Sequence, residues 1–399
     1  PVLLAAELVE RKALDGIDVT DMVQRALAYV ATHGPATDQD RWEEDAGINA
    51  FTVAVCIAAL VCGAPCLPPS ARPWALALAD DWNARLEDWL LASGTDLARQ
   101  YGVERYYVRS APAPGADGKS RLGEALAIKN RLHDPGIPAA DQVATDFLQL
   151  VRLGLRDAHD PLILATVRII DGELKVDTPS GPCWHRYTGD GYGETDDGGP
   201  FLGFGRGRAW PLLTGERGHY ELAAGNDPLP FLKAMNAMTG RSGMLPEQVW
   251  DTDPVEGTVL EPGRPSGSAM PLVWAHAEFI KLVASRALGR PFDRPRAVWD
   301  RYQGQRPEPD HAIWLPQCPF ARIRRGQSLT LALPREARVH HGLDGWQRLA
   351  DVDTEELGLS LHGVHFDAAA LAGATSLDFT FFWKGAQSWE GRDFHVALD

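Results

Sequence analysis

The stretch AGINAFTVAVCIAALVC, residues 46–62, does most to decide the fold class of this chain. Nearly every side chain in it is apolar, which is typical of a helix that is buried on most of its circumference. The segments on both sides of it also follow a helical period. We therefore expect a mainly α-helical fold.

Helical periodicity extends from this stretch to both sides, up to about residue 290. Apolar residues recur three and four positions apart, and the segments that they mark are 2–14, 19–33, 69–91, 141–155, 209–224, 228–239 and 270–288. We expect Ser266 or Ser268 to cap the last of these helices.

Long loops lie between some of the helices, at 100–140 and 156–207. They include short strand-like runs at 105–109 and 167–170. Long loops without helices in a compact domain are often functional, and these loops hold many of the polar candidates.

After about residue 295 the apolar period changes from 3.6 to 2, which indicates strands. The alternation is clearest at Leu329–Leu331–Leu333, Leu357–Leu359–Leu361, Leu377–Phe379–Phe381 and Phe394–Val396–Leu398. We predict a helical domain over 1–295 and a small all-β, sandwich-like domain over 296–399, joined through the proline-rich stretch 306–309.

Charge and composition exclude two classes of partner. The 399 residues carry 39 basic and 54 acidic side chains, a formal charge of −15, and 45% of them are apolar. Nucleic acid and anionic membranes both attract basic surfaces, so neither is expected here. No apolar run approaches the roughly 18 residues that cross a bilayer.

Two short acidic motifs lie beside tryptophans. In the first, Asp40-Arg41-Trp42-Glu43-Glu44-Asp45, a carboxyl group pressed against an aromatic ring in a dry environment would have the raised pKa of a general acid. The alternative is a solvated helix N-terminus whose acids complement the dipole. The second motif contains Glu247 after Pro246, with Trp250 near it, and a surface loop acid is its alternative.

At these residues the chain resembles glycoside hydrolase family 15, the family of bacterial glucoamylases and glucodextranases. Six stretches carry the resemblance in the family's order: QDRWEE (39–44), VCIAAL (55–60), WHRYTGDGYGE (184–194), WPLLTGERG (210–218), PEQVWD (246–251) and GSAMPLVWAHAE (267–278). The resemblance implies an (α/α)6 barrel and an inverting, exo-acting α-glucoside hydrolase that releases β-glucose. Glu43 matches its general acid and Glu247 its general base.

The resemblance also implies supporting roles. Arg186 matches an arginine that binds sugar hydroxyls, and Glu44 matches an acid that serves the sugar on the leaving side. Trp42 would form part of the pocket wall, with Tyr187 and Trp210 beside it. We expect an arginine beside Glu44 to keep that carboxylate ionised. The alternative for Arg186 is an ion pair with Asp190 or Glu194 that orders the loop.

Several alternatives stay open. The same scaffold serves transglucosylases and α-1,6-specific glucosidases, and a non-catalytic glucan-binding protein is a third reading, against which the presence of both glutamates argues. We expect no cofactor and no catalytic metal. A structural Ca²⁺ at 190–194, 196–197 or 251–253 is the weaker alternative to solvated turns. Trp346, Trp383 and Trp389 either bind sugar or pack the β-domain on the barrel.

The resemblance departs from the family at the start of the chain, because a complete barrel of this type has twelve helices and about eight are predicted here. We expect a second polypeptide, the N-terminal part of the same precursor, to complete the barrel, since an open barrel would expose a large apolar surface. Polymeric substrates are met outside the cytoplasm, which favours a secreted or periplasmic location.

Overall fold

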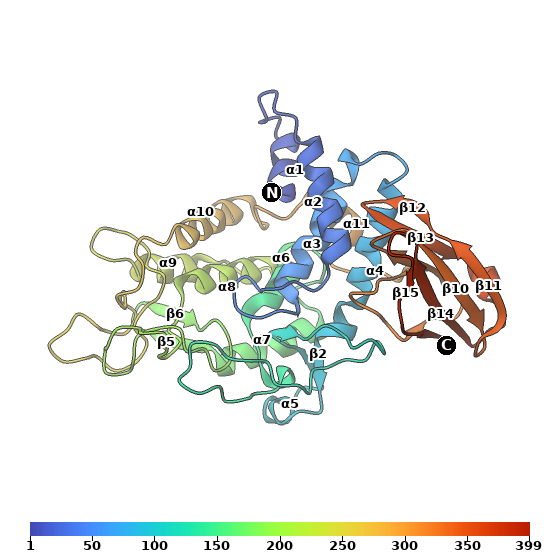
Figure 1. The fold of residues 1–399 in the computed structure, drawn as a ribbon. Coiled ribbons are helices and arrows are strands. Elements are labelled where there is room, and N and C mark those ends of the chain that lie inside the picture. The colour runs from blue at the N-terminus through green and yellow to red at the C-terminus, as the bar shows by residue number, and fades with distance from the viewer.

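Helix α3, Ala50–Gly63, lies at the centre of the helical part of the computed structural model, which describes residues 1–399 (Figure 1). Its buried side chains include Val53, Ile57 and Leu60. Five helices pack against it: α1 (Val2–Glu10), α2 (Thr20–His33), α4 (Arg72–Leu90), α6 (Leu148–Arg152) and α11 (Arg296–Tyr302). The helix predicted from residues 46–62 is thus present, and apolar on most sides because it is covered on most sides.

α3 begins four residues later than its apolar run. Ile48–Asn49 forms the short strand β1, which pairs with β4 (Ser110–Ala111). The Asn49 side chain then accepts hydrogen bonds from the backbone N–H groups of Phe51 and Thr52, at 3.0 and 3.2 Å, and so caps the helix. The acidic motif at 40–45 therefore lies in a loop ahead of the helix.

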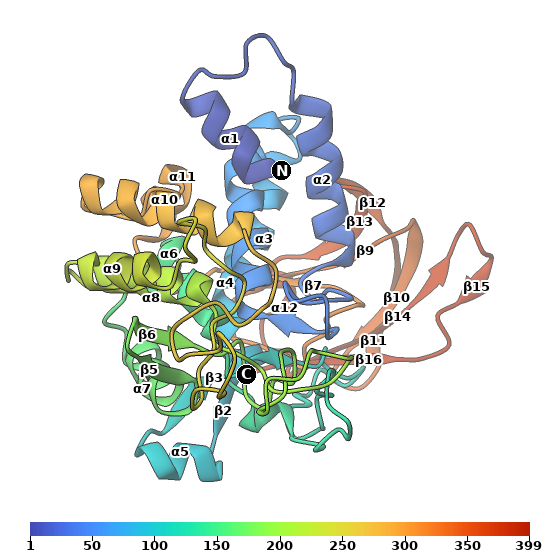
Figure 2. The ribbon, with the colours of Figure 1, turned by 90° about the vertical axis from the view of Figure 1, so that its left-hand side faces the viewer.

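The other helices form a second group around α8, Pro211–Ala223, which is buried continuously from Pro211 to Tyr220. It packs against α6, α9 (Leu229–Ala237) and α10 (Val273–Leu288). Figure 2 shows α8, α9 and α10 stacked side by side. Every predicted helix is present, although the one predicted over 141–155 is reduced to a 3-10 turn at Thr145–Phe147 followed by α6.

One predicted strand is wrong. Residues 167–170 lie inside helix α7, Pro161–Glu173, which Asp160 caps by accepting a hydrogen bond from the Leu162 N–H at 2.8 Å. Ile163, Val167 and Ile170 are buried at spacings of four and three, which is a helical face rather than strand alternation.

The other predicted strand is present as β3, Arg105–Tyr107, which pairs with β2 (Leu91–Ser93). β3 is followed directly by β4, and a separate hairpin joins β5 (Lys175–Thr178) to β6 (Gly181–Trp184). The remaining short helix, α5, spans Asp96–Tyr101. Arg109 thus lies between β3, which pairs with β2, and β4, which pairs with β1.

The C-terminal part is a sandwich of two sheets whose inner faces share one apolar core (Figure 1). One sheet has the order β11-β10-β14-β16-β8, with β15 on β14, and the other has the order β12-β13-β9-β7. The elements are β7 (His311–Trp314), β8 (Arg322–Ile323), β9 (Ser328–Leu333), β10 (Ala337–Leu343), β11 (Gln347–Asp353), β12 (Glu355–Gly358), β13 (Leu361–Phe366), α12 (Ala368–Leu371), β14 (Ser376–Trp383), β15 (Ser388–Trp389) and β16 (Phe394–Leu398). The predicted order of a mainly helical region followed by a β-sandwich is confirmed.

Two details of the prediction differ. Leu359 and Ser360 both have a φ of 56°, so the alternation at 357–361 runs across the turn between β12 and β13 instead of along one strand. Helix α11 follows residue 295 but packs on α3, with Val298 and Tyr302 buried. The helical body therefore extends to Tyr302, and the first strand of the sandwich begins at His311.

Candidate active site

The loop of residues 40–45, called here the Asp40 loop, is wound around one carboxylate. Asp40 Oδ1 accepts hydrogen bonds from the backbone N–H groups of Trp42 and Glu44, at 2.9 and 3.2 Å. Between them Glu43 has a φ of 60°, the left-handed conformation that costs a non-glycine residue about 1–3 kcal/mol. Such strain persists only where the surrounding contacts impose it, and it is common at functional sites.

This conformation determines which glutamate is buried. Glu43 is exposed, whereas Trp42, Glu44 and Asp45 are buried. The dry environment considered for an acid of this motif is found at Glu44 and Asp45, where burial raises the pKa, and not at Glu43. The left-handed turn leaves the Glu43 side chain at the surface, whereas the side chains of Trp42 and Glu44 on either side of it are buried.

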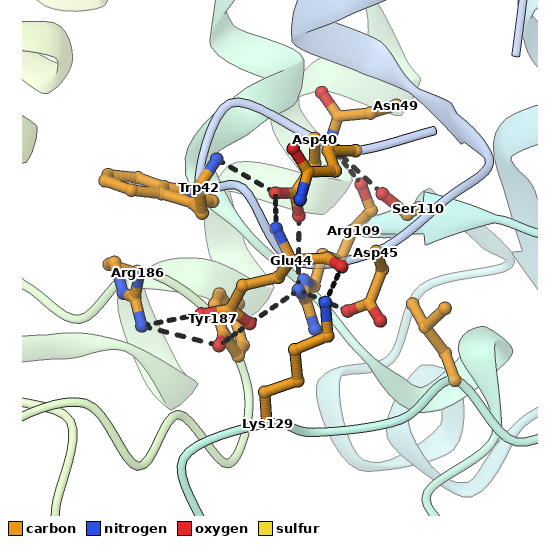
Figure 3. Close-up of polar contacts among 12 residues, drawn as sticks. Asp40, Trp42, Glu44, Asp45, Asn49, Arg109, Ser110, Lys129, Arg186 and Tyr187 are labelled. Atoms are coloured by element: carbon orange, nitrogen blue, oxygen red, sulfur yellow. Dashed lines mark hydrogen bonds and ion pairs between the residues drawn. The ribbon is translucent and has the colours of Figure 1, made fainter. Parts of the chain in front are cut away.

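Glu44 lies at the centre of a polar cluster (Figure 3). Its Oε1 accepts hydrogen bonds from Arg186 at 2.9 Å and Asn130 at 3.3 Å, and its Oε2 accepts from Arg109 at 3.2 Å and from the Tyr187 hydroxyl. Burial raises the pKa of Glu44, while Arg186, Tyr187 and Arg109 act in the opposite direction. The expected arginine beside Glu44 is present, but its effect is outweighed by desolvation.

Arg109 is the residue that sequence reasoning missed. Its guanidinium is fully buried, and Nη2 reaches Asp40 and Glu44 at 3.2 Å each and Asp45 at 2.8 Å. It also lies over the Tyr187 ring, 3.5 Å from the centroid. The available signal was an arginine at the end of a strand-like apolar run, where a charge needs buried partners.

Arg186 joins this cluster to an aromatic one. Its Nε and Nη2 donate to the two oxygens of Asp190, at 2.7 Å each. Its guanidinium carbon lies 4.9–5.7 Å from four ring centroids, those of Trp42, Tyr187, Tyr192 and Trp210. The alternative of a loop-ordering ion pair is therefore present with Asp190, whereas Glu194 accepts from Ser266 instead, at 3.2 Å.

Three tryptophans form a continuous wall beside Arg186. The Trp42 ring meets Trp210 edge-on at 5.1 Å between centroids and Trp274 at 5.5 Å. Trp42 and Trp210 are buried, while Trp274 is exposed. Trp42, Tyr187 and Trp210 thus lie together around one guanidinium, although Tyr187 is almost fully covered.

Glu247 is half-buried, and hydrogen bonds from its own backbone and from the next residue hold its segment in place. Its N–H donates to Ala269 O at 2.8 Å, and the next residue, Gln248, donates from its N–H to Ser268 Oγ at 2.9 Å. Ser266 and Ser268 therefore hold this loop and do not cap α10, which begins at Val273 without a side-chain cap. The prediction of a serine cap is wrong, because both hydroxyls have partners within the loops.

The electrostatics of Glu247 connect it to the same cluster. Burial raises its pKa, and the Tyr192 hydroxyl and the Arg186 guanidinium pull the pKa the other way. Arg186 therefore acts on Glu44 and on Glu247, and Tyr192 stands between Arg186 and Glu247.

One acid in each stretch considered for calcium pairs with an arginine of the chain. Asp190 pairs with Arg186, and Asp251 pairs with His185 at 2.6 Å and Arg208 at 2.8 Å. No group of three or more His, Cys, Asp or Glu side chains is arranged to hold a metal ion. No helix combines the length and the apolar character needed to cross a bilayer.

The tryptophans of the sandwich fall into two kinds. Trp383 is buried and donates from its indole N–H to Glu390 at 2.9 Å. Trp346 and Trp389 lie on either side of His340, with ring centroids 5.6 and 6.2 Å from it, and Trp389 is exposed. Trp383 therefore packs within the sandwich.

Comparison with known proteins fits this arrangement. Residues 4–284 match the family "Glycosyl hydrolases family 15". A glucoamylase of Clostridium sp. (strain G0005) is 38% identical over 295 residues, covering 71% of this chain and 39% of the relative. A bacterial glucoamylase solved in complex with acarbose is 35% identical with a TM-score of 0.66, covering 76% of this chain and 42% of that one. This chain spans about two fifths of the length of these relatives. It belongs to glycosyl hydrolase family 15.

Proposed function

We propose that this chain is the catalytic part of an inverting, exo-acting hydrolase that releases β-glucose from the non-reducing ends of α-glucans or oligosaccharides. Glu43 is its general acid and Glu247 its general base. Family membership and the acarbose complex of a relative support the substrate class. The observation that carries the proposal is that Arg186 binds Glu44 of the Asp40 loop at 2.9 Å and packs 4.9 Å from the ring of Tyr192, whose hydroxyl interacts with Glu247.

The environments of the two glutamates suit two different tasks. Glu43 is exposed on a fixed loop, so its carboxyl group has access to the glycosidic oxygen that it must protonate. Glu247 is half-buried with a raised pKa, which makes it a stronger base toward an attacking water. An inverting mechanism needs about 6.5–9.5 Å between the two carboxyl groups, with that water between them.

Arg186 has one donor group left for the substrate. Nε and Nη2 bind Asp190 and Glu44, and Nη1 has no hydrogen-bond partner in the chain. A planar guanidinium held by two carboxylates can present Nη1 to a sugar hydroxyl in one direction. The C–H face of a sugar ring would then lie against the tryptophan wall, where apolar burial adds to binding.

Glucose release from maltose, isomaltose, dextran and trehalose tests this proposal in the native protein that contains this chain. We expect Glu43→Gln and Glu247→Gln each to lose about 10²–10⁴-fold in rate. Glu104→Gln, an exposed glutamate outside the site, is the matched control. NMR of the first product should give the β-anomer. Unchanged rates in both variants, or α-glucose as the first product, would contradict the mechanism.

We also propose that the N-terminal part of the same precursor covers the exposed apolar side chains of α1 and α10. Leu4 is 63% exposed, and Val273 and Ile280 are 76% and 66% exposed. Exposed apolar side chains that gather in one area usually mark an interface. Val273 directly precedes Trp274, whose ring lies 5.5 Å from that of Trp42, so a cover over this end of α10 would border the site. A stable, soluble monomer with no companion fragment on a denaturing gel would rule this out.

A further inference from the structure

We propose that Arg109 is the positioning residue of the Asp40 loop, and that its guanidinium fixes the direction in which Glu43 points. This inference rests on the proposed role of Glu43 as the general acid. Arg109 itself does not reach the solvent, so it can act only through the residues that it holds.

The backbone of Arg109 is rigidly placed. Its N–H donates to Gln142 O at 2.7 Å, and its carbonyl accepts from the Asn49 side chain at 2.9 Å. Asn49 in turn caps α3 and donates to Asp146 at 2.7 Å. The position of the guanidinium is therefore set by the central helix and by the β1–β4 pair.

From this fixed point the contacts lead to Glu43 in two steps. Nη2 binds Asp40 Oδ2, and Asp40 Oδ1 holds the N–H groups on either side of Glu43 (Figure 3). The same guanidinium binds Glu44 and Asp45, the two residues that follow. Three of the six loop residues are thus fixed to one cation, and the left-handed turn at Glu43 lies within this clamp.

Charge explains why the clamp would open without Arg109. Asp40, Glu44 and Asp45 are buried carboxylates that meet at one point. Without the guanidinium the three carboxylates would repel one another, and Asp40 and Asp45 would lose the arginine that they pair with, which is costly in a buried site. The loop would relieve this by moving toward water, and Glu43 would leave its strained conformation.

A substrate that needs no acid separates positioning from a general structural role. Fluoride leaves α-glucosyl fluoride without being protonated, whereas the sugar leaving group of maltose needs a proton on the glycosidic oxygen. We expect Arg109→Ala to lower kcat on maltose by about a hundredfold, the scale of a misplaced catalytic group. Its kcat on the fluoride should stay within a few fold of the parent.

Arg156→Ala is the matched control. Arg156 is equally buried and binds Glu87 at 2.7 and 2.9 Å and Asn83 at 2.6 Å, but it touches no residue of the Asp40 loop. Both alanine variants should lower the unfolding temperature. Only Arg109→Ala should separate the two substrates, and added guanidinium ion at non-denaturing concentration should partly restore its activity on maltose.

Arg109→Lys keeps the positive charge but loses the forked donor geometry of the guanidinium. This variant provides the test if Arg109→Ala does not fold. It should also lose more activity on maltose than on the fluoride. An equal loss on both substrates, or no loss on either, in the folded variants would overturn the inference. Glu43→Gln is assayed in parallel as an independent test of the acid role. If Glu43 is not the general acid, Glu43→Gln will lose no more activity on maltose than on the fluoride.

Discussion

Arg186 donates from Nη2 to Glu44 Oε1 over 2.9 Å and so joins two segments that are 142 residues apart in the chain. The contact brings the Asp40 loop against the loop of residues 184–194, and Tyr192 of that second loop reaches Glu247. Three motifs that are distant in sequence thereby meet at one guanidinium.

Replacing Tyr192 with Phe should move the acid limb of the pH–rate profile. The Tyr192 hydroxyl favours the charged form of Glu247 and so lowers its pKa, although burial raises it more strongly. Without the hydroxyl the pKa of Glu247 rises further, so a base that must be ionised fails at a higher pH. The profile of kcat/KM against pH should show its acid limb shifted upward, and a downward shift would contradict the assignment.

Arg186→Lys should reduce stability although the charge is kept. Lysine cannot make the paired contacts at 2.7 Å to Asp190 together with the contact to Glu44, and a lost charged hydrogen bond costs about 1.5–3 kcal/mol. Urea unfolding measures the change. Arg286→Lys is the control, because Arg286 binds Asp227 with a similar fork on the surface, where solvent screens the pair and the loss of stability should be much smaller.

Gly191→Ala should disturb the site through packing alone. A Cβ at Gly191 would lie 2.0 Å from the carbonyl oxygen of Asn130, so the backbone beside Asp190 must move. Overpacking of this kind costs about 1–3 kcal/mol. Gly123→Ala is the comparison, since nothing lies within 4 Å of a Cβ there. Equal unfolding midpoints and equal kcat for the two variants would refute the expectation.

His311 should make stability depend on pH. Burial and the neighbouring His365 lower the pKa of His311 to about 4, and its ring accepts or donates a hydrogen bond with Thr330 at 2.7 Å. The unfolded chain takes up this proton near pH 6.5, whereas the folded chain does so only near pH 4. The contribution of His311 to the free energy of unfolding is therefore present above pH 6.5, declines as the pH falls toward 4, and levels off below that.

His311→Gln should flatten this part of the stability curve, measured as urea midpoints across that pH range. His365, with Asp367 at 3.0 Å from its Nε2, is the titratable neighbour of His311, and Trp74 of α4 packs against both rings. His133→Gln, at an exposed histidine, should leave the slope unchanged. A slope that persists in His311→Gln would assign the effect elsewhere.

The sequence by itself determined the helices, the change to strands near residue 300 and the order of the motifs. These features are local: an apolar residue every three to four positions makes a helical face wherever it is buried, and α3 shows this most directly. The same logic fails at residues 167–170, because a short apolar run fits a strand and a helix equally well. There the structure shows a helix, with Asp160 as its cap and buried residues four and three positions apart.

Only the tertiary structure decided which side chains of the site are buried and what they bind. The two adjacent glutamates of the Asp40 loop are chemically alike, yet Glu43, which has the left-handed conformation, is exposed and Glu44 is buried. Asp40 holds that turn through the N–H groups of Trp42 and Glu44, and Asp40 is itself bound by Arg109, which lies 64 to 69 residues away in the chain from the carboxylates that it holds. Residue type sets a local preference, but the partner of a buried charge is set by whichever distant segment folding brings against it.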